Sequence, residues 1–315
     1  MSQPVNQEPQ LTPETSQQKP FAEHPDWFNT FLDHFNGKRL GTKVTPEHLQ
    51  EKFPALWSKI TDPSQPVDIL FIGAGNGIYE VPLIADFAHT RGESNGMSVY
   101  CMDPSQKLHE QFVQNAQSQG VAGTVKGYAE TTFEDPSYHP PKADLAVASH
   151  CWYYVPDGEG TSPETNPLVK FAQAIKPGGA GLIALQSETS DNFKFRREFT
   201  PKVHGRSVTE KSGEDIERQL DTLGIVHEGV DVKAETDMTP IFPQGTFDPT
   251  EEGKKILSFM VREEWDKLTP ELQGEIKARL TETVKRNVEE TDKNVMYFRE
   301  RFIWMPGKES TEESR

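Results

Sequence analysis

A glycine-rich turn directly follows one of the most apolar segments of the sequence. Residues 67–72 read Val-Asp-Ile-Leu-Phe-Ile, and residues 73–77 read Gly-Ala-Gly-Asn-Gly. Glycine lets the backbone turn tightly and approach a ligand without an intervening Cβ atom. We therefore predict a strand that ends in a nucleotide-binding turn, with Gly73, Ala74 and Gly75 beside the ligand. A tight loop without a ligand is the alternative.

The spacing of the glycines indicates which kind of nucleotide is bound. Dinucleotide sites use G-x-G-x-x-G, whereas Ile78 stands here where the third glycine would be. A second apolar segment, 98–102, ends in Asp103-Pro104-Ser105. A carboxylate at the end of a strand can accept both hydrogen bonds of a ribose diol, so Asp103, Pro104 and Ser105 are predicted cofactor contacts. Alternatively, Asp103 only caps the following helix, a role that Ser105 can also fill.

Segments with strand and helix character alternate around this turn. They are strand 67–72, a helix to Ala88, strand 98–102, a helix from Ser105, strands 124–127 and 143–148, helix 167–175 and strand 180–186. This rhythm is typical of a parallel sheet that helices cover on both faces. A capping box at Ser212 and Asp215 opens a later helix, and residues 225–234 and 295–305 read as two more strands.

Further helices are predicted on either side of the alternating region. Two helical faces, 27–35 and 45–60, precede the first strand, and helices at 257–268 and 270–288 precede the last one. The terminal segments hold almost nothing that a core could bury, and we expect them to be disordered. The predicted organisation is a disordered tail over 1–25, one domain over 26–306 with a helical insertion at about 249–290, and a disordered tail over 307–315.

Composition and charge argue against several classes of protein. The chain has 315 residues with 33 basic and 49 acidic side chains, which gives a formal net charge of −16. This charge repels a phosphate backbone, so nucleic acid is not an expected partner. No apolar segment approaches the roughly 20 residues that span a bilayer and no secretory signal is found, so we expect no membrane contact and a cytoplasmic location. Cys101 and Cys151 lack zinc-ligand spacing; we expect buried, reduced thiols and no metal.

Several short motifs together resemble the class I S-adenosylmethionine-dependent methyltransferases. They are the G-x-G-x-G turn, the acidic end of the second strand, Ala129-Glu130-Thr131-Thr132, Ala143-Asp144-Leu145 and Ile175-Lys176-Pro177-Gly178-Gly179. The resemblance covers residues 67–186 and implies a Rossmann-like, doubly wound α/β fold with a seven-stranded sheet whose last strand is antiparallel. It also implies S-adenosylmethionine as cofactor, with Glu130, Thr131 and Ser149 as further contacts.

The chain also resembles the histamine N-methyltransferase family. The resemblance rests on Phe31-Leu32-Asp33-His34, on Trp152-Tyr153-Tyr154-Val155 and on the segments 213–216 and 220–224. The family's imidazole-binding glutamate falls near Gly37 in this sequence, and His150 replaces the glutamine before the tyrosine pair. An imidazole would lose its partner at Gly37, so we expect a less polar or differently shaped amine as the methyl acceptor.

Side chains after the fourth strand are candidate catalytic contacts of that acceptor. His150, Tyr153 and Tyr154 lie just past the strand, at the edge where open parallel sheets bind their ligands. The tyrosines can flank a cationic or aromatic substrate, although we expect one of the pair to belong to the core. His150 is either a structural hydrogen-bonding group or a substrate contact. Phe193 and Phe195, in a predicted loop after the fifth strand, either line the pocket or form a separate hydrophobic cluster.

We therefore expect a cytoplasmic enzyme that transfers a methyl group from S-adenosylmethionine to a small-molecule acceptor, an amine nitrogen. The methyl group is already activated in this cofactor, so the protein has mainly to align the nucleophile and exclude water. The alternatives are a small-molecule O-methyltransferase, an NAD(P)-dependent oxidoreductase and a non-catalytic cofactor-binding protein. The G-x-G-x-G spacing and Glu130 argue against the oxidoreductase.

Overall fold

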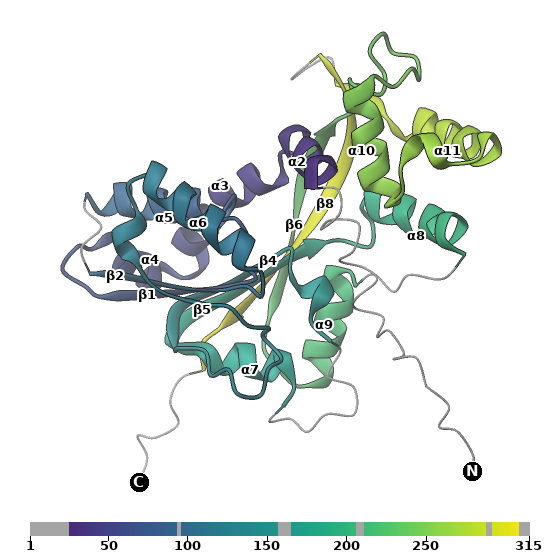
Figure 1. Ribbon diagram of the computed structural model, residues 1–315. Coiled ribbons are helices and arrows are strands. Elements are labelled where there is room, and N and C mark those ends of the chain that lie inside the picture. Colours follow the sequence, from purple (N-terminus) through teal and green to yellow (C-terminus); the bar gives the residue numbers. More distant parts are fainter. Residues whose placement is uncertain (1–24, 93–95, 157–164, 206–210, 288–291, 309–315) are drawn as a thin grey trace, which may run out of the picture. The chain divides into compact units, whose positions relative to one another are not determined.

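The computed structural model describes residues 25–92, 96–156, 165–205, 211–287 and 292–308 (Figure 1). The predicted tails, 1–25 and 307–315, lie almost entirely outside these residues. The chain divides into two compact units. The sheet unit takes in 36–194, 209–235 and 297–315, and the helical unit takes in 1–35, 195–208 and 236–296.

A mixed sheet forms the framework, with the strand order β3-β2-β1-β4-β5-β8-β6. Strands β1 to β5 run parallel to their neighbours in this order, and β8 runs antiparallel to β5. This arrangement confirms the predicted doubly wound α/β fold with an antiparallel last strand. Within the described segments the sheet has eight strands rather than seven, because the short β7 pairs with β8. The strands are β1 Val67–Ile72, β2 Met97–Met102, β3 Val125–Ala129, β4 Ala143–Ser149, β5 Ile175–Gln186, β6 Glu228–Asp237, β7 Lys285–Asn287 and β8 Lys293–Pro306.

Helices cover both faces of the sheet because its central strands are apolar on both sides. Successive side chains of a strand point to opposite faces. In β1, Ile69 and Phe71 accordingly join one buried cluster, whereas Leu70 and Ile72 join another. Helices α3 Gly37–Lys52, α4 Pro54–Thr61, α5 Glu80–Arg91 and α6 Gln106–Ser118 contribute to the first cluster, and α7 Pro167–Ala174 and α9 Gly213–Thr222 to the second (Figure 1).

Between residue 25 and the first strand, the structure has three helices rather than the two predicted. The first is α2 Pro25–His34, and the second predicted helix is divided between Lys52 and Pro54 into α3 and α4. Proline is favourable in the first turn of a helix, where its missing N–H group has no intrahelical acceptor, and unfavourable further inside. A new helix therefore starts at Pro54, whereas the amphipathic pattern alone continues across it.

The segment 188–205, predicted as a loop, contains helix α8 Asp191–His204. Phe193, Phe195 and Phe199 are all buried in it. The rings of Phe195 and Phe199, one helical turn apart, have centroids 4.8 Å from each other. This i, i+4 pair stabilises a helix, and the helix continues through Pro201 to His204. The structure therefore places these phenylalanines in packed helix rather than in a loop.

The helical unit contains α2, α10 Glu251–Val261, the 3₁₀ turn η3 Trp265–Lys267 and α11 Pro270–Thr283. Helices α2 and α10 pack through Phe31 and Phe259, whose ring centroids are 4.4 Å apart. The helix predicted to reach Leu268 ends at Val261, because Arg262 adopts a left-handed conformation with φ of 61°. The helix predicted to reach Val288 ends at Thr283, before β7. The predicted domain limits, with an insertion at about 249–290, stay a prediction.

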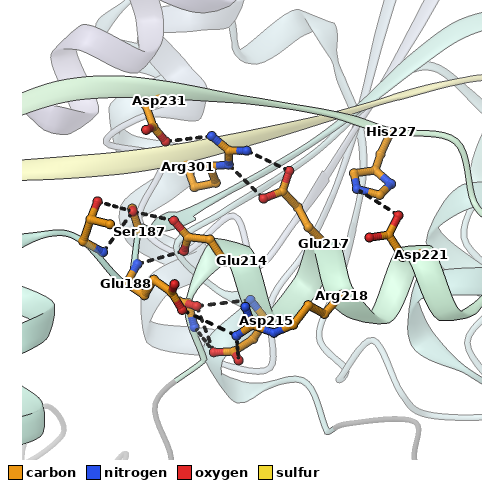
Figure 2. A network of polar contacts seen from close by, with 12 residues as sticks. Ser187, Glu188, Glu214, Asp215, Glu217, Arg218, Asp221, His227, Asp231 and Arg301 are labelled. Carbon is orange, nitrogen blue, oxygen red and sulfur yellow. Dashed lines mark hydrogen bonds and ion pairs between the residues drawn. The ribbon is translucent and has the colours of Figure 1, made fainter.

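A network of ion pairs ties helix α9 to strand β8 (Figure 2). The Arg301 guanidinium donates two hydrogen bonds to Glu217 of α9, at 2.9 and 3.0 Å, and one to Asp231 of β6, at 2.8 Å. The helix approaches the strand so closely that a Cβ atom on Gly213 would lie 2.3 Å from the Arg301 Cβ atom. A glycine is therefore required where α9 begins.

The same helix holds the segment that follows β5. Its first turn carries the predicted capping box, which the structure confirms between Ser212 and Asp215. In that turn the Glu214 carboxylate accepts hydrogen bonds from Ser187 Oγ at 2.5 Å and from the Glu188 backbone N–H at 2.8 Å (Figure 2). The carboxyl end of β5 is thereby held in place.

Among the residues that the structure describes, every helix is too short or too polar to traverse a lipid bilayer.

Candidate active site

The carboxyl ends of four parallel strands lie level with one another. In the pairing register, Ile72 of β1 is opposite Met102 of β2 and Ala148 of β4, and Met102 is opposite Ala129 of β3. The predicted cofactor contacts follow directly: the glycine turn after β1, Asp103 after β2, Glu130 after β3, and Ser149 at the end of β4. Open parallel sheets bind ligands at this edge. The sheet therefore brings the predicted cofactor residues to one edge.

The glycine turn adopts backbone conformations that favour glycine. Gly73 has φ of 62°, and a Cβ atom there would lie 2.3 Å from the Cys151 Cβ atom. Gly75 has φ of 54°, but a Cβ atom there would come no nearer than 3.9 Å to the Gly73 carbonyl oxygen. The Ala74 N–H donates to the Met102 carbonyl at 3.0 Å, which fixes the turn against β2. Gly73 thus permits close packing inside the protein, whereas the space beside Gly75 is open to a ligand.

Asp103 links the glycine turn to the start of α6. Its Oδ2 atom accepts from the Gly75 N–H at 3.1 Å and its Oδ1 atom from the Ser105 N–H at 2.9 Å. The residue is 8% exposed, and this burial raises the pKa of its carboxyl group, although the two N–H groups act in the opposite direction. Each carboxylate oxygen can accept about two hydrogen bonds, so capacity for a diol is left. Ser105 itself caps α6, accepting from the Leu108 N–H at 3.3 Å.

The predicted contacts after β3 have partners that sequence reasoning missed. Glu130 Oε1 lies 2.9 Å from His109 Nδ1, and the His109 ring stacks on Tyr128 with centroids 3.8 Å apart. The Tyr128 hydroxyl donates to the Gly75 carbonyl at 3.3 Å, which connects this stack to the glycine turn. His109 lies four residues after the helix cap Ser105. This spacing could have indicated that the two residues lie on the same face of α6. Thr131 instead donates to Asp135 at 3.2 Å, within its own turn.

His150 occupies an unusual position directly after β4. Its φ of 54° is uncommon for a residue with a side chain. Its Nε2 atom lies 3.2 Å from Glu300 Oε2, and its Nδ1 atom lies 3.3 Å from the Tyr153 hydroxyl oxygen. That hydroxyl oxygen also accepts from the Gln186 N–H at 3.1 Å. His150 and Tyr153 therefore belong to one polar cluster that joins the ends of β4 and β5 to β8.

The expectation that one of the two tyrosines faces the core agrees with Tyr153, which is partly buried and packs against the hydrophobic cluster that contains Trp152. Tyr153 and Tyr154 are both partly exposed, and their rings are nearly perpendicular, at 81°, with centroids 6.3 Å apart. The core residue of this segment is Trp152, which is 1% exposed. The segment forms a 3₁₀ turn, η2 Trp152–Tyr154, in which successive side chains point about 120° apart. One of the three residues is therefore buried, and both tyrosines stay partly open to a ligand.

Glu300 is the residue of this cluster that sequence reasoning missed. It is fully buried in β8, opposite Gln186 of β5. The sequence did contain a signal, because Phe298 and Phe302 stand two residues away on either side, and alternate strand residues share a face. A glutamate between two core phenylalanines is therefore predicted to point inward.

The two cysteines are free thiols with different surroundings. Cys101 is buried, as predicted, and burial raises the pKa of its thiol. Cys151, also predicted to be buried, is partly exposed and donates through Sγ to the Ile72 carbonyl at 3.1 Å. It lies at the edge of the sheet, where it packs against Gly73, and not inside the core. Within the described part of the chain, no three His, Cys, Asp or Glu side chains are grouped so that they could hold a metal ion.

Comparison with known proteins gives similarity at the level of structure only. No protein-family model matches the sequence. No curated protein matches it either. The similar solved structures include the YcgJ protein from Bacillus subtilis, with 12% identity and a TM-score of 0.49 over 81% of this chain and 97% of that chain.

Two further similar structures contain bound S-adenosylhomocysteine. Magnesium protoporphyrin IX methyltransferase from Synechocystis, with bound S-adenosylhomocysteine, has 15% identity and a TM-score of 0.47 over 71% of this chain and 93% of that chain. A methyltransferase from Thiobacillus denitrificans in complex with S-adenosyl-L-homocysteine has 19% identity and a TM-score of 0.39, over 81% and 91%. The fold of this chain is established by the strand order of its own sheet.

Proposed function

We propose that this chain is an S-adenosylmethionine-dependent methyltransferase that acts on a small nucleophile, an amine nitrogen. The observation that carries the proposal is Asp103, a nearly buried carboxylate next to a glycine turn and at the carboxyl end of β2. Keeping a carboxylate there costs solvation, which raises its pKa. A ribose diol that donates two hydrogen bonds would offset that cost.

The residues present fit this cofactor. The open side of Gly75 leaves room beside the backbone, and Asp103 has acceptor capacity for the ribose. His109 and Glu130 offer a ring and a carboxylate at the next strand end, where the base of the cofactor would lie. When bound, the cofactor supplies an activated methyl group. The chain's own task is then to align the nucleophile and to exclude water.

Tyr153 and Tyr154 are proposed to border the methyl acceptor, together with His150. Their segment packs against the glycine turn through Cys151, which a Cβ atom on Gly73 would contact. Both rings are partly exposed, so they can flank a substrate. The resemblance to the histamine N-methyltransferase family supports an amine as this substrate. A hydroxyl acceptor is the second candidate, because His150 and Glu300 offer a place for the proton that a hydroxyl must lose.

Calorimetry on the full-length protein tests the proposal most directly. We expect S-adenosylhomocysteine to bind and to raise the melting temperature by mass action, and NAD to do neither. Binding of NAD in preference would show an oxidoreductase instead. A panel of small amines and hydroxyl compounds, assayed for transfer of a labelled methyl group, then separates an enzyme from a non-catalytic cofactor-binding protein.

Replacing Asp103 with alanine should weaken S-adenosylhomocysteine binding roughly 10- to 150-fold. The basis is the loss of hydrogen bonds to a charged acceptor, worth about 1.5–3 kcal/mol. Asp86→Ala, which removes an exposed carboxylate from α5, is the matched control and should leave the affinity unchanged. Because burial raises the pKa of Asp103, the wild-type affinity should also fall with acidification at a higher pH than an exposed aspartate would give. Equal affinity in wild type and Asp103→Ala would remove Asp103 from the site.

Because Gly37 stands where an imidazole-binding glutamate is expected, histamine should not be the preferred methyl acceptor. Gly37 begins α3 and has no side chain with which to hold an imidazole. A buried polar group without a partner costs about 1–3 kcal/mol, so histamine should be used roughly 5- to 150-fold less efficiently than the best amine of the panel. Competition between histamine and the other amines for a limiting amount of labelled cofactor measures this difference. The prediction is wrong if histamine is the preferred acceptor.

A further inference from the structure

A tyrosine of β3 reaches the glycine turn that follows β1. The Tyr128 hydroxyl donates to the Gly75 carbonyl at 3.3 Å. In the sheet β2 lies between β1 and β3, so this hydrogen bond links segments on either side of β2. The Gly75 N–H donates in turn to Asp103 Oδ2 at 3.1 Å. Gly75 is therefore hydrogen-bonded through both of its backbone groups, to Tyr128 and to Asp103.

The Tyr128 ring is held by two side chains of α6. It stacks on the His109 ring, with centroids 3.8 Å apart and planes at 11°, and meets the Phe112 ring edge-on with centroids 5.6 Å apart. His109 and Phe112 are three residues apart and so share one face of the helix. Burial raises the pKa of the Tyr128 phenol, so the hydroxyl keeps its proton and can donate it. The donor that reaches Gly75 is thus fixed in place from α6.

Gly75 depends on these hydrogen bonds for its conformation. A residue without a Cβ atom adopts positive and negative φ about equally readily, and Gly75 has φ of 54°. A Cβ atom there would meet no described atom nearer than the Gly73 carbonyl oxygen, at 3.9 Å, so close packing does not hold this residue. Without the Tyr128 hydroxyl, Gly75 would be held through its N–H group alone.

We propose that Tyr128 is a positioning residue of the cofactor site, whose hydroxyl fixes Gly75 so that the Gly75 N–H keeps the Asp103 carboxylate in its binding orientation. This inference rests on the proposed methyltransferase function, in which Asp103 accepts hydrogen bonds from the ribose of the cofactor. A turn and a carboxylate that are already in place lose less conformational entropy when the ligand binds. Tyr128 acts through Gly75 and Asp103.

A double-mutant cycle, measured by calorimetry with S-adenosylhomocysteine on the full-length protein, tests the proposal. Tyr128→Phe keeps the ring and removes only the hydroxyl, so it should weaken binding roughly 3- to 10-fold, the usual loss for one hydrogen bond. In the Asp103→Ala background the same substitution should change the affinity by less than about twofold, because the carboxylate that Gly75 orients is gone. Equal losses in both backgrounds would show two independent effects and would overturn the proposal.

Tyr138→Phe is the matched control for the lost hydroxyl. Tyr138 also follows β3, and it contacts the Phe133 ring and the Lys170 ammonium group. Neither of these contacts involves the glycine turn, so the affinity should stay within about twofold of the wild-type value. A loss in Tyr138→Phe as large as that in Tyr128→Phe would remove the special role of Tyr128.

The Tyr128→Phe variant is expected to fold, because the glycine turn has a second support from α6. Asn115 Nδ2 donates to the Asn76 carbonyl at 2.8 Å. Tyr128→Phe leaves this hydrogen bond and both ring contacts of residue 128 in place. Its effect should therefore be confined to the orientation of Gly75.

Amide NMR of the protein without ligand gives a readout that does not depend on binding. Labelling the alanine carbonyls with ¹³C and the glycine amides with ¹⁵N selects the glycines that follow an alanine, which are Gly75, Gly123 and Gly181. Gly75→Ala identifies the Gly75 signal by its loss. In Tyr128→Phe this signal should move toward its position in Asp103→Ala, while the Gly181 signal stays unchanged. A Gly75 signal that does not move in Tyr128→Phe would overturn the proposal.

Failure of this proposal can be distinguished from failure of the proposed function. If the wild type does not bind S-adenosylhomocysteine, the proposed function is wrong and the positioning role falls with it. If the wild type binds and Tyr128→Phe binds equally well, only the positioning role of Tyr128 is wrong.

Discussion

Replacing Gly73 with alanine should lower the free energy of unfolding by about 2–5 kcal/mol and abolish most cofactor binding. Two effects add. The φ of 62° is unfavourable for a residue with a side chain, and the new methyl group would lie 2.3 Å from the Cys151 Cβ atom. The turn would have to move away from Cys151, and the Gly75 N–H would lose its alignment with Asp103. Urea denaturation and calorimetry with S-adenosylhomocysteine measure the two consequences.

Two further variants separate the two effects at Gly73. Gly120→Ala imposes a similar backbone conformation, with φ of 72°, where an added Cβ atom has no described neighbour within 4 Å. This variant should lower the free energy of unfolding by only about 1–2 kcal/mol, which is the part caused by the unfavourable backbone conformation. The double variant Gly73→Ala with Cys151→Gly removes the clash and should recover part of the loss. If Gly73→Ala costs no more than Gly120→Ala, the close packing on Cys151 is not what requires a glycine.

Replacing Asp144 with asparagine should lower the free energy of unfolding by roughly 2–4 kcal/mol, slightly below the range for a fully buried ion pair. The carboxylate is 5% exposed and accepts from Lys59 Nζ at 2.6 Å, Lys176 Nζ at 3.1 Å and the Asp68 N–H at 2.9 Å. An asparagine removes the counter-charge that Lys59 and Lys176 share, although Lys176 keeps its ion pair with Asp68. Each lysine side chain is about one third exposed, which moderates the cost.

The pH dependence of stability supplies an independent check on Asp144. Burial alone would raise the pKa of this carboxyl group, but the Asp68 N–H, Lys59 and Lys176 together lower it. A lowered pKa means that the stabilisation is complete above the pKa of the unfolded chain and is lost as the pH falls through the lower folded-state value. The stability difference between wild type and Asp144→Asn should therefore shrink on acidification. An unchanged difference at low pH would contradict this role.

A substitution at Asp144 should change the stability of the fold without changing cofactor binding. Asp144 is the second residue of β4, and its carboxylate accepts a hydrogen bond from the N–H of Asp68, the second residue of β1. Asp144 therefore lies at the amino ends of these strands. The predicted cofactor residues follow the carboxyl ends. Asp144→Asn should therefore lose stability and, where it stays folded, keep its affinity for S-adenosylhomocysteine. Asp86→Asn, a substitution on the exposed face of α5, is the control and should change neither property.

Local patterns were sufficient for the strands other than β7, for the glycine turn and for the capping box of α9. Each depends on residues close together in the chain: alternation or apolarity over a few positions, three glycines in five, or a serine and an aspartate three apart. The predictions failed where a local pattern was ambiguous. An amphipathic face continued across Phe53 and Pro54, and the segment that forms helix α8 was expected to be a loop. The full burial of Trp152, next to a Tyr153 that packs only partly against the same cluster, depends on a 3₁₀ turn, which has no clear sequence signature.

The sequence by itself determined that Asp103 and the glycine turn share one edge of the sheet, because the carboxyl ends of neighbouring parallel strands must meet there. Only the tertiary structure decided that Glu300 faces His150, 150 positions away. That contact requires β8 to lie beside β5 in the register that pairs Glu300 with Gln186. A register shift of one residue would turn Glu300 to the opposite face. Register is decided by packing across the whole sheet, and no short segment of the chain contains it.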